Sequence, residues 1–102
     1  MPFRRVATPA EIAAGQGRLV ESGGLSVAVF NAGEGRYYAC GGSCPHEDGP
    51  LAEGWLEGES VVCPWHGFSF DLASGRCLVD PDLAIRVYAV RVTNDAVEVD
   101  LP

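Results

Sequence analysis

Two short cysteine–histidine stretches constrain this chain more than any other feature of its sequence. Cys44 and His46 enclose a proline in a CxH pattern, and sixteen residues later Cys63 and His66 form a CxxH pattern that also begins Cys-Pro. Thiolate and imidazole bind iron and zinc well at neutral pH, and both histidines of the chain lie within three residues of a cysteine. Because proline fixes φ directly after each cysteine, we expect two stiff loops that hold one small inorganic centre.

The residue spacing alone leaves the identity of the metal open. Two cysteines and two histidines also make a tetrahedral structural zinc site, so both a zinc module and an iron centre remain possible here. The other two cysteines, Cys40 and Cys77, have no histidine or proline beside them. Extra ligands or a disulfide are alternatives for this pair, but we expect both to pack in the core as small hydrophobic side chains.

Length and charge limit the function classes. The 102 residues fit one domain, residues 1–102, and 14 acidic against 7 basic residues give a formal charge of −7. This charge argues against binding nucleic acid or an anionic membrane surface and favours a basic protein partner. Residues 1–11 contain two arginines with no apolar run behind them, so we expect neither a signal peptide nor a membrane anchor. We expect a cytoplasmic monomer, and a reducing cytoplasm favours metal ligation over disulfides.

The pattern of residues predicts an all-β fold built from antiparallel strands. Thr8, Pro9 and Glu11 are suited to start a short helix, at most a turn or two. Asn94 and Asp95 predict a hairpin turn that closes the C-terminal strands, because both tolerate a left-handed backbone. The strands are expected at residues 18–20, 25–30, 36–40, 60–63, 68–72, 85–92 and 96–101. The region of residues 40–77, rich in glycine, proline and acidic residues, is expected to form a loop-built subdomain around the metal.

One long stretch resembles a known family. The residues from Cys44 to Gly75, CPHEDGPLAEGWLEGESVVCPWHGFSFDLASG, are similar to the cluster-binding segment of Rieske ferredoxins, including those that serve aromatic-ring dioxygenases. The resemblance covers both loops and their connector, and it implies the Rieske fold with sandwich-like antiparallel sheets. It also implies one [2Fe–2S] cluster, with Cys44 and Cys63 on the inner iron and His46 and His66 on the outer iron. The two histidines are then the expected exit for electrons.

Departures from other Rieske types indicate a low reduction potential. High-potential relatives carry a disulfide between positions that correspond here to Gly49 and Trp65, and neither residue can form that bridge. The same relatives place hydrogen-bond donors where this chain has Phe68 and Phe70. We therefore expect a potential near the low end of the Rieske range, about −150 mV rather than about +300 mV.

The resemblance implies an electron carrier and not an enzyme in isolation. The main hypothesis is a ferredoxin that passes electrons from a flavin-dependent reductase to a terminal oxygenase. A small redox subunit of a nitrite-reductase-like enzyme is the alternative, and a structural zinc module is a further one. The Rieske domain of an oxygenase would require another domain with histidine and carboxylate ligands, which this chain lacks.

Several residues around the predicted loops have two interpretations each. The acidic side chains are either a solvated face or a docking patch: Glu47, Asp48, Glu53, Glu57 and Glu59. Trp65 is expected to shield the cluster rather than gate it, and Trp55 is expected to cover the base of the loops. Asp71 is expected to stabilise a turn and to have no catalytic role.

Overall fold

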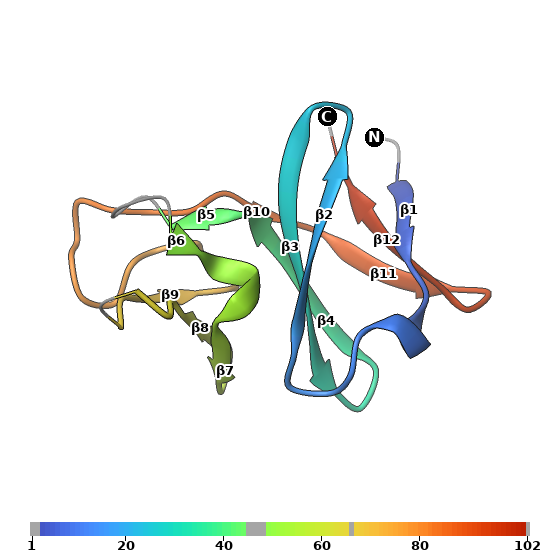
Figure 1. Cartoon of the computed structure of the whole chain (residues 1–102), viewed down its shortest axis with the longest axis horizontal. Coiled ribbons are helices and arrows are strands. Elements are labelled where there is room, and N and C mark those ends of the chain that lie inside the picture. The colour runs from blue at the N-terminus through green and yellow to red at the C-terminus, as the bar shows by residue number, and fades with distance from the viewer. Residues whose placement is uncertain (1–2, 45–48, 66, 102) are drawn as a thin grey trace.

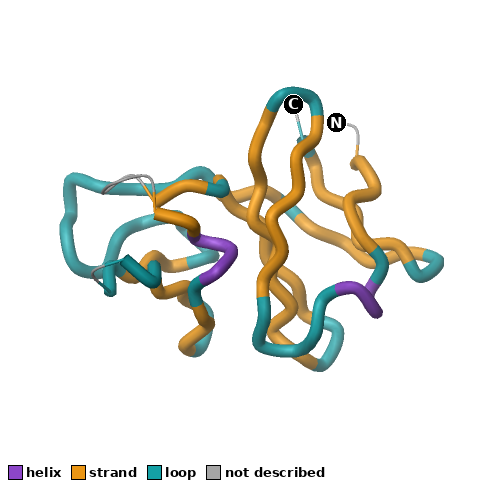
Figure 2. Tube along the Cα trace, in the orientation of Figure 1, coloured by secondary structure: helices purple, strands orange, loops and turns teal. Residues whose placement is uncertain are grey.

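The fold is all-β, with two single turns of 3-10 helix, in a computed structural model that describes residues 3–44, 49–65 and 67–101 (Figures 1 and 2). The elements follow the chain in this order: β1 (Phe3–Ala7), η1 (Pro9–Glu11), β2 (Gly17–Ser22), β3 (Leu25–Gly33), β4 (Arg36–Gly41), β5 (Ser43–Cys44), β6 (Gly49–Pro50), η2 (Leu51–Glu53), β7 (Trp55–Glu57), β8 (Ser60–Val62), β9 (Ser69–Asp71), β10 (Val87–Tyr88), β11 (Val90–Thr93) and β12 (Ala96–Asp100). None of the helices in these described ranges is long and apolar enough to cross a membrane.

A four-stranded sheet in the order β10-β4-β3-β2 occupies the middle of the molecule (Figure 1). On one side lies a three-stranded sheet in the order β1-β12-β11, and on the other lie a second three-stranded sheet, β7-β8-β9, and the short pair β5-β6. The strand pairs of the described residues are antiparallel, as the sequence predicted.

The central strand β3 has both faces buried. Val27 and Val29 belong to the hydrophobic cluster that packs against the β1-β12-β11 sheet. Ala28 and Phe30 belong to the second hydrophobic cluster, which contains Cys44 and lies on the opposite face of β3. Alternate residues of a strand point to opposite faces, so four consecutive apolar residues contribute to two cores at once. One face of the central sheet thus packs against the region from β5 to β9.

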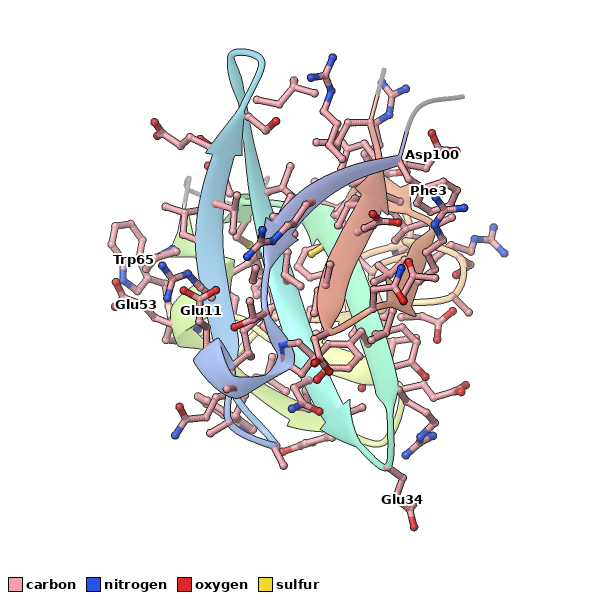
Figure 3. All side chains as sticks on the ribbon, turned by 90° about the vertical axis from the view of Figure 1, so that its right-hand side faces the viewer. Phe3, Glu11, Glu34, Glu53, Trp65 and Asp100 are labelled. Atoms are coloured by element: carbon pink, nitrogen blue, oxygen red, sulfur yellow. The ribbon has the colours of Figure 1, made fainter. Side chains whose placement is uncertain are left out.

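Tight two-residue turns join successive strands. Glu34 and Gly35 both have positive φ (56° and 76°) between β3 and β4, and Figure 3 shows Glu34 at the tip of that hairpin. Asn94 and Asp95 likewise have φ of 52° and 62° between β11 and β12, which confirms the predicted C-terminal hairpin. Two positive φ angles in a two-residue loop are typical of the turn whose twist matches antiparallel strands.

The predicted strand at residues 85–92 is wrong as one element. Tyr88 pairs with Ala39 in the central sheet, but Val90 pairs with Val99 in the neighbouring sheet, so the chain changes sheets at Ala89. The alternation of β-branched residues with other residues in this segment does not reveal such a crossing, because that pattern is the same in either sheet. The sequence also missed β1 and the short strands β5, β6 and β7.

The predicted helical start at Thr8 is confirmed as the single turn η1. The backbone N–H of Thr8 donates to Oε1 of Glu11 at 2.7 Å, and the N–H of Glu11 donates to the carbonyl of Thr8 at 3.0 Å. These bonds direct the chain from β1 toward β2.

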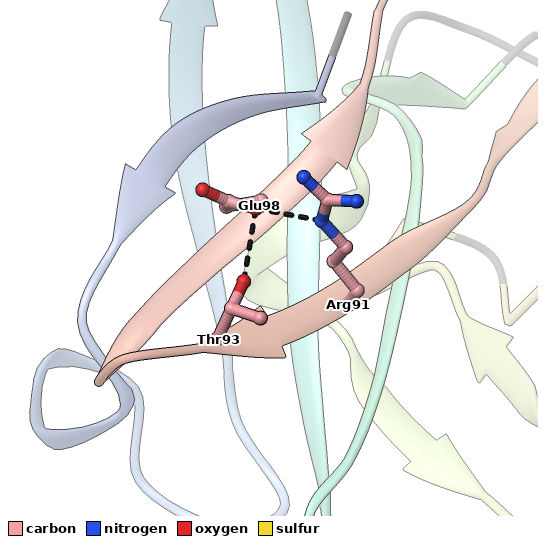
Figure 4. A network of polar contacts seen from close by, with 3 residues as sticks. All are labelled: Arg91, Thr93 and Glu98. Atoms are coloured by element: carbon pink, nitrogen blue, oxygen red, sulfur yellow. Dashed lines mark hydrogen bonds and ion pairs between the residues drawn. The ribbon is translucent and has the colours of Figure 1, made fainter. Parts of the chain in front are cut away.

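One side chain links the three strands of the β1-β12-β11 sheet. Nε of Arg91 donates to Oε1 of Glu98 at 2.7 Å, and the hydroxyl of Thr93 donates to the same oxygen at 3.0 Å (Figure 4). The guanidinium of Arg91 also lies 4.0 Å from the ring centroid of Phe3 on β1. The donors lower the pKa of Glu98 below its usual value, that of Arg91 most and that of Thr93 next.

We expect Arg91→Gln to raise the pKa of Glu98 and Thr93→Val to raise it less, because each removes a donor that favours the carboxylate. A carbon-13 NMR titration of the glutamate carboxyls measures this, with Arg36→Gln as the control. A lowered folded-state pKa stabilises the fold above the ordinary glutamate pKa, and this contribution is lost as pH falls through the folded value. Identical Glu98 titration curves in Arg91→Gln and the unmodified protein would contradict the assignment.

Candidate metal centre

The first predicted loop is closed at its base by the β5-β6 pair. Cys44 lies opposite Gly49 in this ladder, and Ser43 lies opposite Pro50. The cysteine therefore sits at the end of a fixed strand pair, with its side chain buried. The tip of the loop, with His46, Glu47 and Asp48, lies outside the described residues.

The second predicted loop is closed by a backbone hydrogen bond. The N–H of Cys63 donates to the carbonyl of Phe68 at 2.7 Å. Gly67 has a φ of +72°, a conformation that other residues rarely adopt, and this allows the chain to turn back within six residues. His66 lies outside the described residues, so its predicted role as a ligand stays a prediction.

Gly49 is the close neighbour of both buried cysteines. It pairs with Cys44 in the ladder, and a Cβ built on it would lie only 2.7 Å from Sγ of Cys63. The side chains of Cys44 and Cys63 are 1% and 0% exposed. Two buried cysteines next to a residue without a side chain suit a small metal centre that excludes water.

The structure also brings together the two positions that carry a disulfide in high-potential Rieske proteins. The Cβ built on Gly49 would lie 3.4 Å from Cβ of Trp65, close to the separation of Cβ atoms in a disulfide. In this chain the indole of Trp65 lies against Gly49 instead, and about half of it is exposed to solvent. Trp65 therefore covers Gly49, the residue next to the sulfur of Cys63. This contact supports the prediction that Trp65 shields the cluster.

The aromatic residues after the second loop pack inward. Phe70 is fully buried in the core cluster that contains Cys44 and Cys63, and Phe68 packs against the same cluster. Their hydrocarbon side chains donate no hydrogen bonds at this site. The acidic Asp71 accepts hydrogen bonds from the N–H and hydroxyl of Ser74, which confirms its predicted role in a turn.

Cys40 and Cys77 are core residues, as predicted. Both are buried in the cluster around Phe30 and Phe70, and none of the four cysteines, all within the described ranges, forms a disulfide. Burial raises the pKa of the Cys40 thiol to about 12, so this thiol stays protonated at neutral pH. A protonated, buried thiol is a poor metal ligand.

Two surface features lie near the predicted loops. Trp55 lies about half-exposed on β7, with its indole N–H donating to Oε2 of Glu57 at 3.0 Å, and its predicted covering of the base of the loops stays a prediction. Leu78 and Val79 are two adjacent, mostly exposed apolar residues in the loop after β9, and the sequence analysis gave them no role. The sequence signal that could have pointed to them is the pair of adjacent apolar residues directly after Cys77.

A family model and curated relatives match this chain. The model described as "Rieske [2Fe-2S] domain" matches residues 3–89. The ferredoxin subunit of 3-phenylpropionate/cinnamic acid dioxygenase from Escherichia coli (strain K12) is 37% identical over 78 residues, which cover 74% of this chain and 73% of that protein.

Solved structures with the same fold include two kinds of redox protein. The ferredoxin of carbazole 1,9a-dioxygenase from Nocardioides aromaticivorans IC177 matches with a TM-score of 0.88 and 27% identity over 100% of both chains. A putative NADH-dependent nitrite reductase small subunit from Mycobacterium tuberculosis matches with a TM-score of 0.90 and 25% identity, covering 99% of this chain and 96% of the other.

We expect Gly49→Ala to lower the cluster content to roughly half or less, because the added methyl group would overlap Sγ of Cys63 and displace it. Iron and acid-labile sulfide per chain, with the visible spectrum, measure the effect. Gly41→Ala is the matched control, because a Cβ there meets nothing within 4 Å. Equal cluster content in the two variants would show that the contact at Gly49 does not matter.

Proposed function

This chain belongs to the Rieske [2Fe–2S] domain family, and on that premise we propose that it carries single electrons from a reductase to a terminal oxygenase. One observation of the structure supports this most directly: Cys44 and Cys63 are both buried next to Gly49, which pairs with Cys44 in the β5-β6 ladder and closely approaches Sγ of Cys63. The name of the 3-phenylpropionate/cinnamic acid dioxygenase relative, a ferredoxin subunit, supports the same role.

The proposed ligands are Cys44 and Cys63 for the inner iron and His46 and His66 for the outer iron. The cluster, when bound, takes up and releases one electron, and two neutral imidazoles in place of two thiolates raise its potential above that of all-cysteine clusters. The chain's own residues exclude water: Phe70 and the cysteines lie in a closed core, and Trp65 covers Gly49 from outside. The histidines are the proposed electron exit.

The chain acts in this proposal as a component of an oxidoreductase system and performs no substrate chemistry itself. Residues 40–77 form the cluster-binding part of a single domain of residues 1–102. A flavin-dependent reductase and a terminal oxygenase are the proposed partners. Because buried cysteines without disulfides are typical of a reducing compartment, we also propose a cytoplasmic location. The proposed state is a monomer.

A second candidate is a small redox subunit of a nitrite-reductase-like enzyme. The fold match to the Mycobacterium tuberculosis protein favours it, and that likeness covers nearly the whole of both chains. The sequence relatives favour the dioxygenase system, because they are ferredoxin subunits at higher identity. Reduction of the purified holoprotein by a dioxygenase-type flavin reductase, followed by transfer to an oxygenase, separates the two candidates.

The ligand set is tested by single cysteine variants. We expect Cys44→Ser and Cys63→Ser each to abolish the cluster spectrum and to destabilise the loops, because metal binding and folding are coupled. Cys40→Ser is the matched control, since it removes an equally buried thiol from the same core. It should keep the visible and EPR spectra. Loss of the cluster in the Cys40→Ser variant would overturn the ligand assignment.

The function is tested by redox titration of the holoprotein, with visible and EPR spectra recorded at each potential. We expect a brown protein with a Rieske signal and a potential near about −150 mV, because Phe68 and Phe70 donate no hydrogen bonds to the centre. A midpoint well above zero would contradict the low-potential proposal. A colourless protein that holds one zinc ion would contradict the electron-carrier function.

A further inference from the structure

An open cleft of about 500 Å³ lies between the turn before β2 and the segment from η2 to β7. Residues 15–17 form one wall, and residues 52–55 form the other. The two walls approach closely at Gly17 and Ala52, because a Cβ on Gly17 would lie 2.9 Å from the carbonyl oxygen of Ala52. The cleft is therefore bounded by glycine backbone, with the longer side chains of Gln16, Glu53 and Trp55 around it.

The first wall is fixed to the central sheet through Asn31. The N–H of Gly15 donates to the carbonyl of Asn31 at 2.7 Å, and the N–H of Asn31 donates to the carbonyl of Gln16 at 3.0 Å. The side-chain amide of Asn31 also donates to the carbonyl of Ile12 at 2.8 Å. These bonds hold the turn in one place, so this wall does not need to be ordered by a ligand.

The second wall is fixed by the turn η2. The N–H of Gly54 donates to the carbonyl of Leu51 at 3.0 Å, and the side chain of Leu51 is fully buried in the core cluster. Trp55 then pairs with Val62 in the β7-β8 ladder. The position of the indole is thus set by the sheet behind it and by its hydrogen bond to Glu57.

The chemistry of the lining suits a cation. Trp55 offers a half-exposed aromatic surface, and Glu53 adds an exposed carboxylate. The lining contains no basic residue, and the whole chain has a formal charge of −7. An aromatic face beside a carboxylate attracts a guanidinium or ammonium group through cation–π and ionic contacts together.

We propose that this cleft receives an arginine or lysine side chain of the redox partner, held by the ring of Trp55 and the carboxylate of Glu53. The inference rests on the proposed function, because it takes the partner to be the protein that exchanges electrons. The cleft begins at Ala52, and the Cα atoms of Gly49 and Ala52 are at most about 11 Å apart along the chain, so the cleft and the candidate metal centre share the segment that runs from β6 into η2. Figure 3 shows Glu53 and Trp65 on the same side of the molecule.

Fluorine NMR of the oxidised holoprotein tests this proposal with a defined probe. The chain has two tryptophans, so labelling with 5-fluorotryptophan gives two resonances, which Trp55→Phe assigns. The probe is the peptide acetyl-Gly-Arg-Gly-amide, and the same peptide with citrulline is its neutral control. We expect the arginine peptide to shift the Trp55 resonance saturably at millimolar concentration, and the citrulline peptide to leave it unchanged.

Two charge variants separate the cleft from the general acidity of the chain. Glu53→Gln should weaken arginine-peptide binding by roughly two- to fivefold, the size expected for one exposed ionic contact. Glu34→Gln removes the same charge at the distant tip of the β3–β4 hairpin and should change nothing. Equal weakening by the two variants, an unmoved Trp55 resonance, or an equal response to citrulline would each overturn the proposal.

The visible spectrum of the same sample distinguishes failure of the cleft from failure of the proposed function. A holoprotein with the Rieske spectrum whose Trp55 resonance does not respond contradicts the cleft proposal alone. A protein without that spectrum contradicts the proposed function, whatever the peptide does.

Discussion

The close approach of Gly49 to Sγ of Cys63 is the contact on which the candidate centre depends. A side chain at position 49 would occupy the space beside that sulfur, 2.7 Å away, and Gly49 also pairs with Cys44. One residue without a side chain thus allows two thiols from separate loops to be buried together. The close packing of Trp65 against Gly49 depends on the same missing side chain.

The central sheet makes that approach possible because β3 is buried on both faces. Phe30 packs toward the cysteine side, and Val29 packs toward the sheet of β1, β11 and β12. The same strand also positions the cleft, since Asn31 holds its first wall. A rigid support of this kind is what loop-built sites require, because loops have few internal contacts to fix their geometry. The candidate centre and the cleft therefore share one structural base.

Much of the fold was predictable because it depends on local patterns. Asn94 and Asp95 indicated a tight turn, and their positive φ angles confirm it. The crossing at Ala89 was not predictable, since the residues on either side have the same β character in both sheets.

By itself, the sequence determined the all-β class and the C-terminal hairpin turn, and it named the four residues proposed as ligands, because those features depend on residue type and short spacing. Only the tertiary structure decided that Gly49 closely approaches Sγ of Cys63, and that residues 15–17 face residues 52–55 across a cleft. Both are contacts between separate elements of the fold. Their distances depend on how the sheets pack, and no local pattern encodes them.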